Sequence, residues 1–87
     1  MLETTEVFEL IVSGKKKFKI TNDTSQYKSG DILIFKEIDS NKELTGRELR
    51  CELVHVLNDL FFVPEGYINL LFVPLGENKG EGEEVDA

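Results

Sequence analysis

The first apolar residues along the chain recur at intervals of three and four, which is the spacing of one helical face. They are Val7, Phe8, Ile11 and Val12. Thr4 and Thr5 can cap the start of a helix, and Gly14 is a natural stop. The pattern predicts one N-terminal helix over about residues 4–13.

Beyond Gly14 the apolar period changes to two, and turn signals divide the chain into short strands. The segment 17–21 alternates, with Phe18 expected in the core and Lys16 at its rim. The segment 32–35 is apolar at every position, so we expect a central strand that is covered on both faces. A final strand is expected over 67–73, ended by Pro74.

A further strand begins near Arg47 and shows a clear alternation. Its inward residues are expected to be Leu49, Cys51 and Leu53. The alternation breaks at Val54, which predicts a β-bulge or a change to burial on both faces. Together these patterns predict an α+β fold, a small and mostly antiparallel curled sheet or pseudo-barrel with one N-terminal helix.

The chain has 87 residues, which corresponds to one domain. We assign residues 1–76 to this domain and the Gly- and Glu-rich segment 77–87 to a disordered acidic tail. No apolar run approaches the roughly 20 residues of a membrane span, and the first residues lack the basic region of a signal peptide. A cytoplasmic protein without membrane contact is therefore expected, and a single cysteine fits a reducing compartment.

One cysteine and one histidine are too few for a zinc site, so we expect neither a metal nor a cofactor. Cys51 is expected to be an inert core thiol, because it has inward parity. His55 lies between two valines and is expected to be a buried or half-buried structural residue. Glu37 and Lys16 form the one acid–cation pair proposed for catalysis, and it is too weak a signal to assign a catalytic residue.

Charge is distributed unevenly along the chain, which carries a net −7. Residues 14–28 contain five lysines against one aspartate, and four of the lysines lie between positions 15 and 19. Clustered ammonium groups are stabilised by phosphates, which release counterions when they bind. The alternative is a solvated edge strand that lysines protect from aggregation.

Four segments of the chain together form a family-like pattern: Gly14–Ile20, Tyr27–Leu33, Thr45–Leu49 and Gly66–Ile68. They resemble the ASCH domains of the PUA-like superfamily, and most of all a group of short uncharacterised bacterial and phage domains. The resemblance covers about residues 6–75 and implies a pseudo-barrel of up to six strands with a helix at one side. It also implies a cleft for RNA or a nucleotide, and a few ASCH proteins cleave RNA or hydrolyse modified nucleosides.

The chain departs from the family pattern G-x-K-x-x-E-x-R at its two chemically active positions. Gly14 and Lys16 match, but Lys19 stands at the acid position and Thr21 at the arginine position. A carboxylate for proton transfer and a guanidinium for clamping phosphate are both lost, and lysine replaces neither. We therefore expect no hydrolytic activity.

The first functional hypothesis is a non-catalytic, monomeric module that binds RNA or a nucleotide. Its predicted binding residues combine cations with a hydroxyl and two aromatic rings that can stack on bases: Lys16, Lys17, Lys19, Thr21, Tyr27, Arg47 and Tyr67. Ordinary packing is the alternative for the tyrosines, and an ion pair with a neighbouring glutamate is the alternative for the arginine. The other hypotheses are a phage-type factor that binds a host protein through an acidic surface, and a nucleoside or RNA hydrolase.

Overall fold

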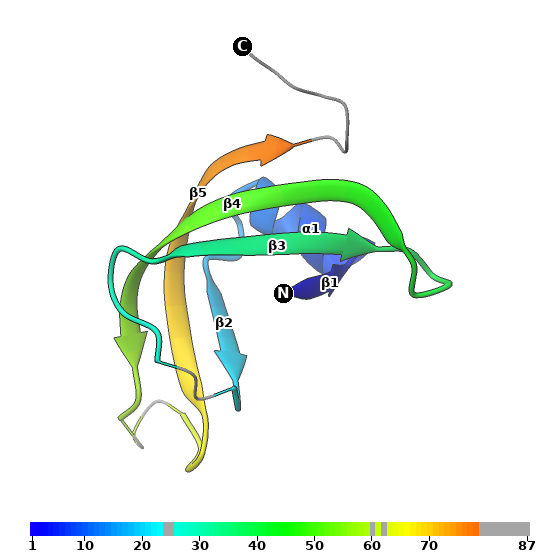
Figure 1. The fold of residues 1–87 in the computed structure, drawn as a ribbon. Coiled ribbons are helices and arrows are strands. Elements are labelled where there is room, and N and C mark those ends of the chain that lie inside the picture. The colour runs from blue at the N-terminus through cyan, green and yellow to red at the C-terminus, as the bar shows by residue number, and fades with distance from the viewer. Residues whose placement is uncertain (24–25, 60, 62, 79–87) are drawn as a thin grey trace.

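The computed structural model describes residues 1–23, 26–59, 61 and 63–78. Within these residues five strands form one curled sheet, and a single short helix packs against its inner face (Figure 1). In chain order the elements are β1 (Leu2–Thr4), α1 (Thr5–Val12), β2 (Phe18–Thr21), β3 (Ile32–Ile38), β4 (Leu44–Leu57) and β5 (Ile68–Asn78). The predicted α+β fold with a curled, mostly antiparallel sheet is confirmed as a half-barrel.

The order of the strands places the first two strands of the chain at opposite edges of the sheet. The order is β1-β3-β4-β5-β2, with β1 parallel to β3 and the other pairs antiparallel. Figure 1 shows that β4 and β5 are long and bent, which curls the sheet. Lys19 Nζ on β2 lies 2.7 Å from Glu3 Oε2 on β1, so an ion pair joins the two edges.

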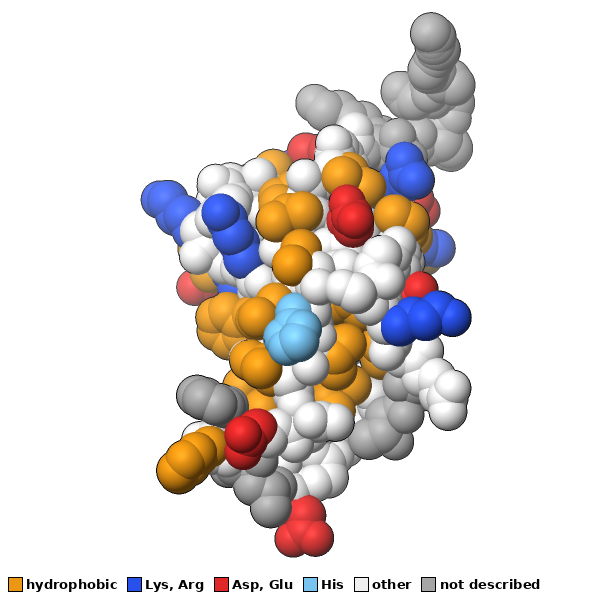
Figure 2. Space-filling model, turned by 90° about the vertical axis from the view of Figure 1, so that its left-hand side faces the viewer, with side chains coloured by type: hydrophobic (Ala, Val, Ile, Leu, Met, Phe, Trp, Pro, Cys, Tyr) orange, Lys and Arg blue, Asp and Glu red, His pale blue; other side chains and the backbone are white. Residues whose placement is uncertain are grey.

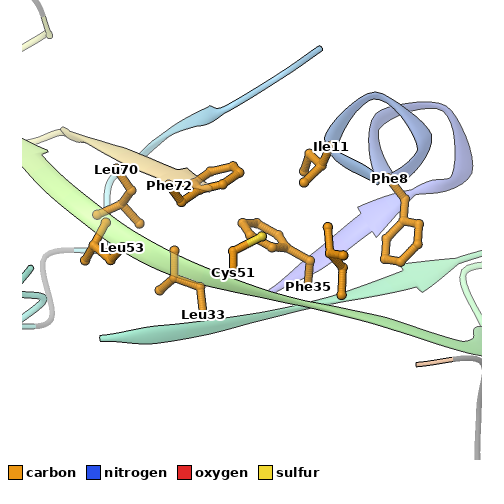
Figure 3. Close-up of a cluster of buried hydrophobic side chains, with 9 residues drawn as sticks. Phe8, Ile11, Leu33, Phe35, Cys51, Leu53, Leu70 and Phe72 are labelled. Atoms are coloured by element: carbon orange, nitrogen blue, oxygen red, sulfur yellow. The ribbon is translucent and has the colours of Figure 1, made fainter. Parts of the chain in front are cut away.

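The core lies between α1 and the inner face of the sheet, as Figure 3 shows. Phe8 and Ile11 on one face of α1 are fully buried, which confirms the predicted helical face. The rings of Phe35 and Phe72 pack with centroids 4.9 Å apart. The sheet contributes the remaining members of this cluster: Leu33, Phe35, Leu49, Cys51, Leu53, Leu70 and Phe72. The structure contains no described helix long and apolar enough to cross a membrane.

The burial of Cys51 and the alternation of β4 agree with the predictions from the sequence. Leu49, Cys51 and Leu53 all point inward and are at most 2% exposed. Burial raises the pKa of the Cys51 thiol to about 11, which leaves it protonated and unreactive at neutral pH. The expected inert core thiol is confirmed.

The break in the alternation of β4 is a β-bulge. The register between β4 and β5 shifts between Leu53 and His55, which leaves Val54 as an extra residue. Val54 and His55 are both exposed, so the two successive side chains leave the core together. The bulge is confirmed, but the prediction that His55 is buried or half-buried is wrong, because the bulge changes which residues face outward.

The parity of β2 also differs from the prediction. Phe18 and Ile20 are each 44% exposed on the outer face, while Lys19 and Thr21 face inward and are half-buried. The prediction that Phe18 belongs to the core is wrong. The inner side of β2 meets the carboxylate of Glu3 instead of apolar side chains, so its inward positions are polar.

The strands β3 and β5 each differ from the prediction in one respect. The inward residues of β3 are buried, but Ile32 on the other face is 45% exposed, so the expected cover on both faces is wrong. In β5 the strand continues through Pro74, which was expected to end it. Cys51 pairs with Pro74 and Arg50 with Gly76, and at this bulge the missing N–H of proline is tolerated.

The last part of β5 enters the segment that was assigned to the tail. The strand ends at Asn78, so residues 77 and 78 belong to the sheet. Residues 79–87 lie outside the described part of the chain, and the prediction of a disordered tail there stays a prediction.

Candidate nucleic-acid interface

Four of the seven predicted binding residues lie on or directly before β2. Lys16 and Lys17 precede the strand, and Lys19 and Thr21 lie within it. Tyr67 lies at the far end, because the next residue, Ile68, pairs with Thr21.

Tyr27 reaches the same end of β2 through a short chain of hydrogen bonds. Its hydroxyl donates to Asp23 Oδ2 at 2.9 Å, and the Asp23 backbone N–H donates to Thr21 Oγ1 at 3.0 Å. The ring is half-buried and packs against the core. Burial raises the pKa of Tyr27, and the hydrogen bond to Asp23 adds to this effect. Six of the seven residues therefore lie in β2 or near its two ends, and Tyr67, which is 40% exposed, keeps an accessible ring.

The lysine segment 15–17 is held by its backbone, which leaves the side chains available. Gly14 adopts a positive φ of 79° after the helix, and the N–H groups of Lys15 and Lys16 both donate to the carbonyl of Leu10. The carbonyl of Lys17 accepts a hydrogen bond from the Phe72 N–H at 3.0 Å. Within the described residues no acid forms a salt bridge with these three lysines.

An ammonium group and an exposed ring meet at the start of β2. Lys16 Nζ lies 4.6 Å from the centroid of the Phe18 ring, which is a cation–π contact. Phe18 was expected in the core, and its exposure on the outer face adds an aromatic surface to the lysine segment. Sequence reasoning missed this residue because it read the parity of β2 from the apolar positions alone.

Lys19 and Arg47 differ from the other cations because carboxylates already neutralise them. Lys19 is paired with Glu3, which is 9% exposed. Arg47 lies on β4, away from β2, with Nε 2.6 Å from Glu77 Oε2 and Nη1 2.6 Å from Glu9 Oε2. These hydrogen bonds, that to Glu77 first, raise the pKa of Arg47 further. Arg47 therefore forms ion pairs, as the alternative interpretation predicted. Its partners lie on α1 and β5 instead of next to it in the sequence.

Glu37 is the most deeply buried charged residue in the described part of the chain. It is 4% exposed, and its Oε1 accepts a hydrogen bond from Thr45 Oγ1 at 2.7 Å. Arg47 Nη1 lies 3.8 Å from its Oε2. Hydrogen bonds from Thr45, and secondly from Thr5, lower the pKa of Glu37 despite its burial. The proposed pairing of Glu37 with Lys16 is wrong, and an ionised, fully bonded carboxylate has no proton to donate.

The two buried glutamates occupy matching positions on neighbouring strands. Glu3 on β1 is the register partner of Glu37 on β3, so the two side chains emerge side by side on the inner face. Each is balanced by a cation from a different element, Lys19 from β2 and Arg47 from β4. With Glu9 and Glu77 the group holds four carboxylates and two cations, a net −2. This charge repels phosphate, so the group acts as a structural ion-pair network.

A pH-dependent prediction follows from the lowered pKa of Glu37. A folded-state pKa below the unfolded value of about 4.5 stabilises the fold above pH 4.5, and this stabilisation is lost as the pH falls through the folded-state pKa. Thr45→Val removes the first hydrogen-bond donor. We expect it to lower the free energy of unfolding by about 1–2 kcal/mol at pH 7 and by less at pH 3.

Urea denaturation at both pH values measures this difference. Thr4→Val is the matched control, because Thr4 makes no side-chain capping hydrogen bond. It should change stability little at either pH. An equal loss at pH 7 and pH 3 for Thr45→Val would show that the hydroxyl acts through packing instead of through the ionised carboxylate.

The arrangement offers hydrogen-bond donors and aromatic surface along β2, and in the described part of the chain no group of three or more His, Cys, Asp or Glu side chains is placed to hold a metal ion. A comparison with curated proteins finds no match. A family model described as "Domain of unknown function (DUF3850)" matches residues 3–72, from β1 to Phe72 in β5. The chain therefore belongs to the DUF3850 family.

Proposed function

We propose that this chain is a non-catalytic, cytoplasmic module of the ASCH type that binds single-stranded RNA or a nucleotide along β2. One observation carries the proposal: three lysines without an acidic partner in the described residues directly precede Phe18, a ring that is 44% exposed. Ammonium groups next to exposed aromatic rings are the combination that proteins use to bind single strands.

The two ends of β2 supply different contacts. Lys16 and Lys17, with Lys15, neutralise phosphates at the first end, and Phe18 offers a face for a base. Thr21, Tyr27 and Tyr67 supply hydroxyls and a second ring at the other end. β2 spans four residues, or roughly 13 Å, so a short single strand reaches from one aromatic group to the other.

Lys19 and Arg47 take a smaller part in this proposal than the sequence suggested. A phosphate would have to displace Glu3 from Lys19, and Glu9 and Glu77 from Arg47. The proposal excludes hydrolysis for the reason found in the sequence, since Lys19 and Thr21 replace the acid and the arginine. Glu37 does not restore an acid, because its pKa is lowered.

The test is fluorescence anisotropy of a labelled single-stranded RNA at 50 and 200 mM salt. Three phosphate contacts to a single strand give a salt slope of about −2, which corresponds to roughly a 20-fold loss of affinity between these salts. Lys16→Ala/Lys17→Ala removes two of the contacts. We expect it to weaken binding about tenfold at 50 mM and to bring the slope close to about −0.7.

Lys42→Ala is the matched control, because Lys42 is an exposed lysine in the turn between β3 and β4. Its effect on the salt slope should be negligible. If the double variant and the control bind with the same affinity and slope, the lysine segment is a solvated strand edge and the proposal fails. A labelled duplex DNA in the same titration checks the preference for single strands.

A further inference from the structure

The outer face of the sheet carries apolar side chains that no other part of the described chain covers. Ile32 on β3 is 45% exposed, Val54 on β4 is 48% exposed and Val73 on β5 is 38% exposed. Phe18 and Ile20 on β2 continue the same face. Figure 2 shows part of it, with the histidine side chain (pale blue) between groups of hydrophobic side chains (orange).

The register of the strands makes this face continuous. Ile32 and Val73 both pair with Glu52, so they lie on either side of it. His55 pairs with Leu71, which in turn pairs with Phe18. The five exposed apolar side chains present roughly 400 Å² in total, within the range of the largest patch on a typical monomer, which is often functional. That is about half of the roughly 800 Å² that each partner buries in a standard interface.

The charges that β3 and β4 place on this face are balanced, although the chain carries a net −7. Lys36 and Glu48 form an ion pair at 3.6 Å. Arg50 and Glu52 occupy the next outward positions of β4, and neither has an ion-pair partner among the described side chains. A neutral face offers no net electrostatic attraction to a strongly basic or strongly acidic partner. A second copy of this chain can form two ion pairs with it, because its Glu52 can meet Arg50 and its Arg50 can meet Glu52.

We propose that two copies of the chain pack these outer faces together in a two-fold dimer, with Arg50 of each copy opposite Glu52 of the other. Outward charges along β4 alternate as Glu48, Arg50 and Glu52. An antiparallel copy of β4 therefore sets opposite charges against each other. Glu52 lies between Ile32 and Val73, which places this pairing at the centre of the apolar face. The dimer replaces the monomer expected from the sequence. Its central residues, Arg50 and Glu52, differ from the residues proposed to bind RNA, and Phe18 on the edge strand β2 belongs to both surfaces.

Sedimentation equilibrium of the full chain over a range of concentrations tests the proposal. We expect a reversible dimer for the unmodified chain. Arg50→Glu and Glu52→Arg each place like charges at the centre of the interface and should weaken the dimer at least about tenfold. In an equimolar mixture, the introduced glutamate of one variant faces the introduced arginine of the other, and the unchanged Arg50 and Glu52 also face each other. The mixture should therefore restore a dimer that contains one copy of each variant.

Lys42→Glu is the matched control, because it changes the charge by the same amount at an exposed turn outside the face. It should leave the dimer unchanged, and circular dichroism verifies that every variant is folded. Val54→Asp provides a second disruption that does not depend on the charge pairing. A monomer at all concentrations, or a mixture that stays monomeric while the unmodified chain dimerises, would overturn the proposal and leave the face to a different protein.

Discussion

Replacing Arg47 with leucine is expected to lower the free energy of unfolding by about 2–4 kcal/mol. The guanidinium is the cation that three carboxylates share, those of Glu9, Glu37 and Glu77. Without it Glu37, which is 4% exposed, keeps its hydroxyl donors but loses its counter-charge. The Arg47 side chain is 29% exposed and also lies over the ring of Phe8, so the expected loss combines charge with packing. Urea denaturation at pH 7 measures it.

Two further variants separate these contributions. Lys36→Leu removes the ion pair with Glu48, whose side chains are 43% and 36% exposed, and should cost less than about 1 kcal/mol. Arg47→Leu/Glu37→Leu replaces the innermost pair by apolar groups and should recover part of the loss, because no buried charge is left unpaired. If Arg47→Leu costs no more than Lys36→Leu, the network contributes little to stability.

The predictable parts of the fold are those in which one period of burial continues over several residues. Val7, Phe8 and Ile11 identified the helix, and the odd residues of β4 identified its inward face, because burial repeats with the geometry of each element. The bulge at Val54 was visible for the same reason, since it interrupts that period. Such local patterns need no knowledge of what lies on the other side of the core.

The parts that could not be predicted depend on contacts between distant segments. β1 has three residues, which is too few to show any period, and it pairs with β3 more than 30 positions later. The sequence predicts the wrong parity for β2, because its inward side chain, Lys19, pairs with Glu3 and not with the apolar core. The continuation of β5 through Pro74 could not be predicted, because its bulge depends on the partner strand β4.

The candidate site shows the same difference between local features, which the sequence predicts, and contacts between distant residues, which it does not. The lysine segment could be found because clustered charge is a local property of the sequence, and the structure leaves Lys15, Lys16 and Lys17 without acidic partners among the described residues. The neutralisation of Lys19 and Arg47 could not be found, since their partners lie between 10 and 38 positions away. Cations that appear equivalent in a sequence thus divide into ligand-binding and structural groups once the fold brings acids to some of them.

Lys19→Met and Glu3→Gln should therefore have different effects on RNA binding and a common effect on stability. Lys19→Met leaves the carboxylate of Glu3, 9% exposed, without its cation and should lower the free energy of unfolding by about 2–3 kcal/mol. Glu3→Gln removes the charge and keeps the shape, so it should cost only about 1 kcal/mol. Both variants remove the ion pair that joins β1 to β2, and urea denaturation at pH 7 measures both losses.

The affinity for RNA separates the two variants. In Glu3→Gln the ammonium of Lys19 loses its carboxylate and becomes available to a phosphate beside Lys16 and Lys17. We expect tighter binding of the labelled single strand and a salt slope steeper by about 0.7, the value of one added phosphate contact. Lys19→Met should leave the slope unchanged, because Lys19 makes no phosphate contact while Glu3 holds it. If neither variant has a steeper salt slope than the unmodified protein, Lys19 lies outside the path of the RNA. If Lys19→Met has a shallower salt slope, phosphate displaces Glu3 from Lys19 in the unmodified protein.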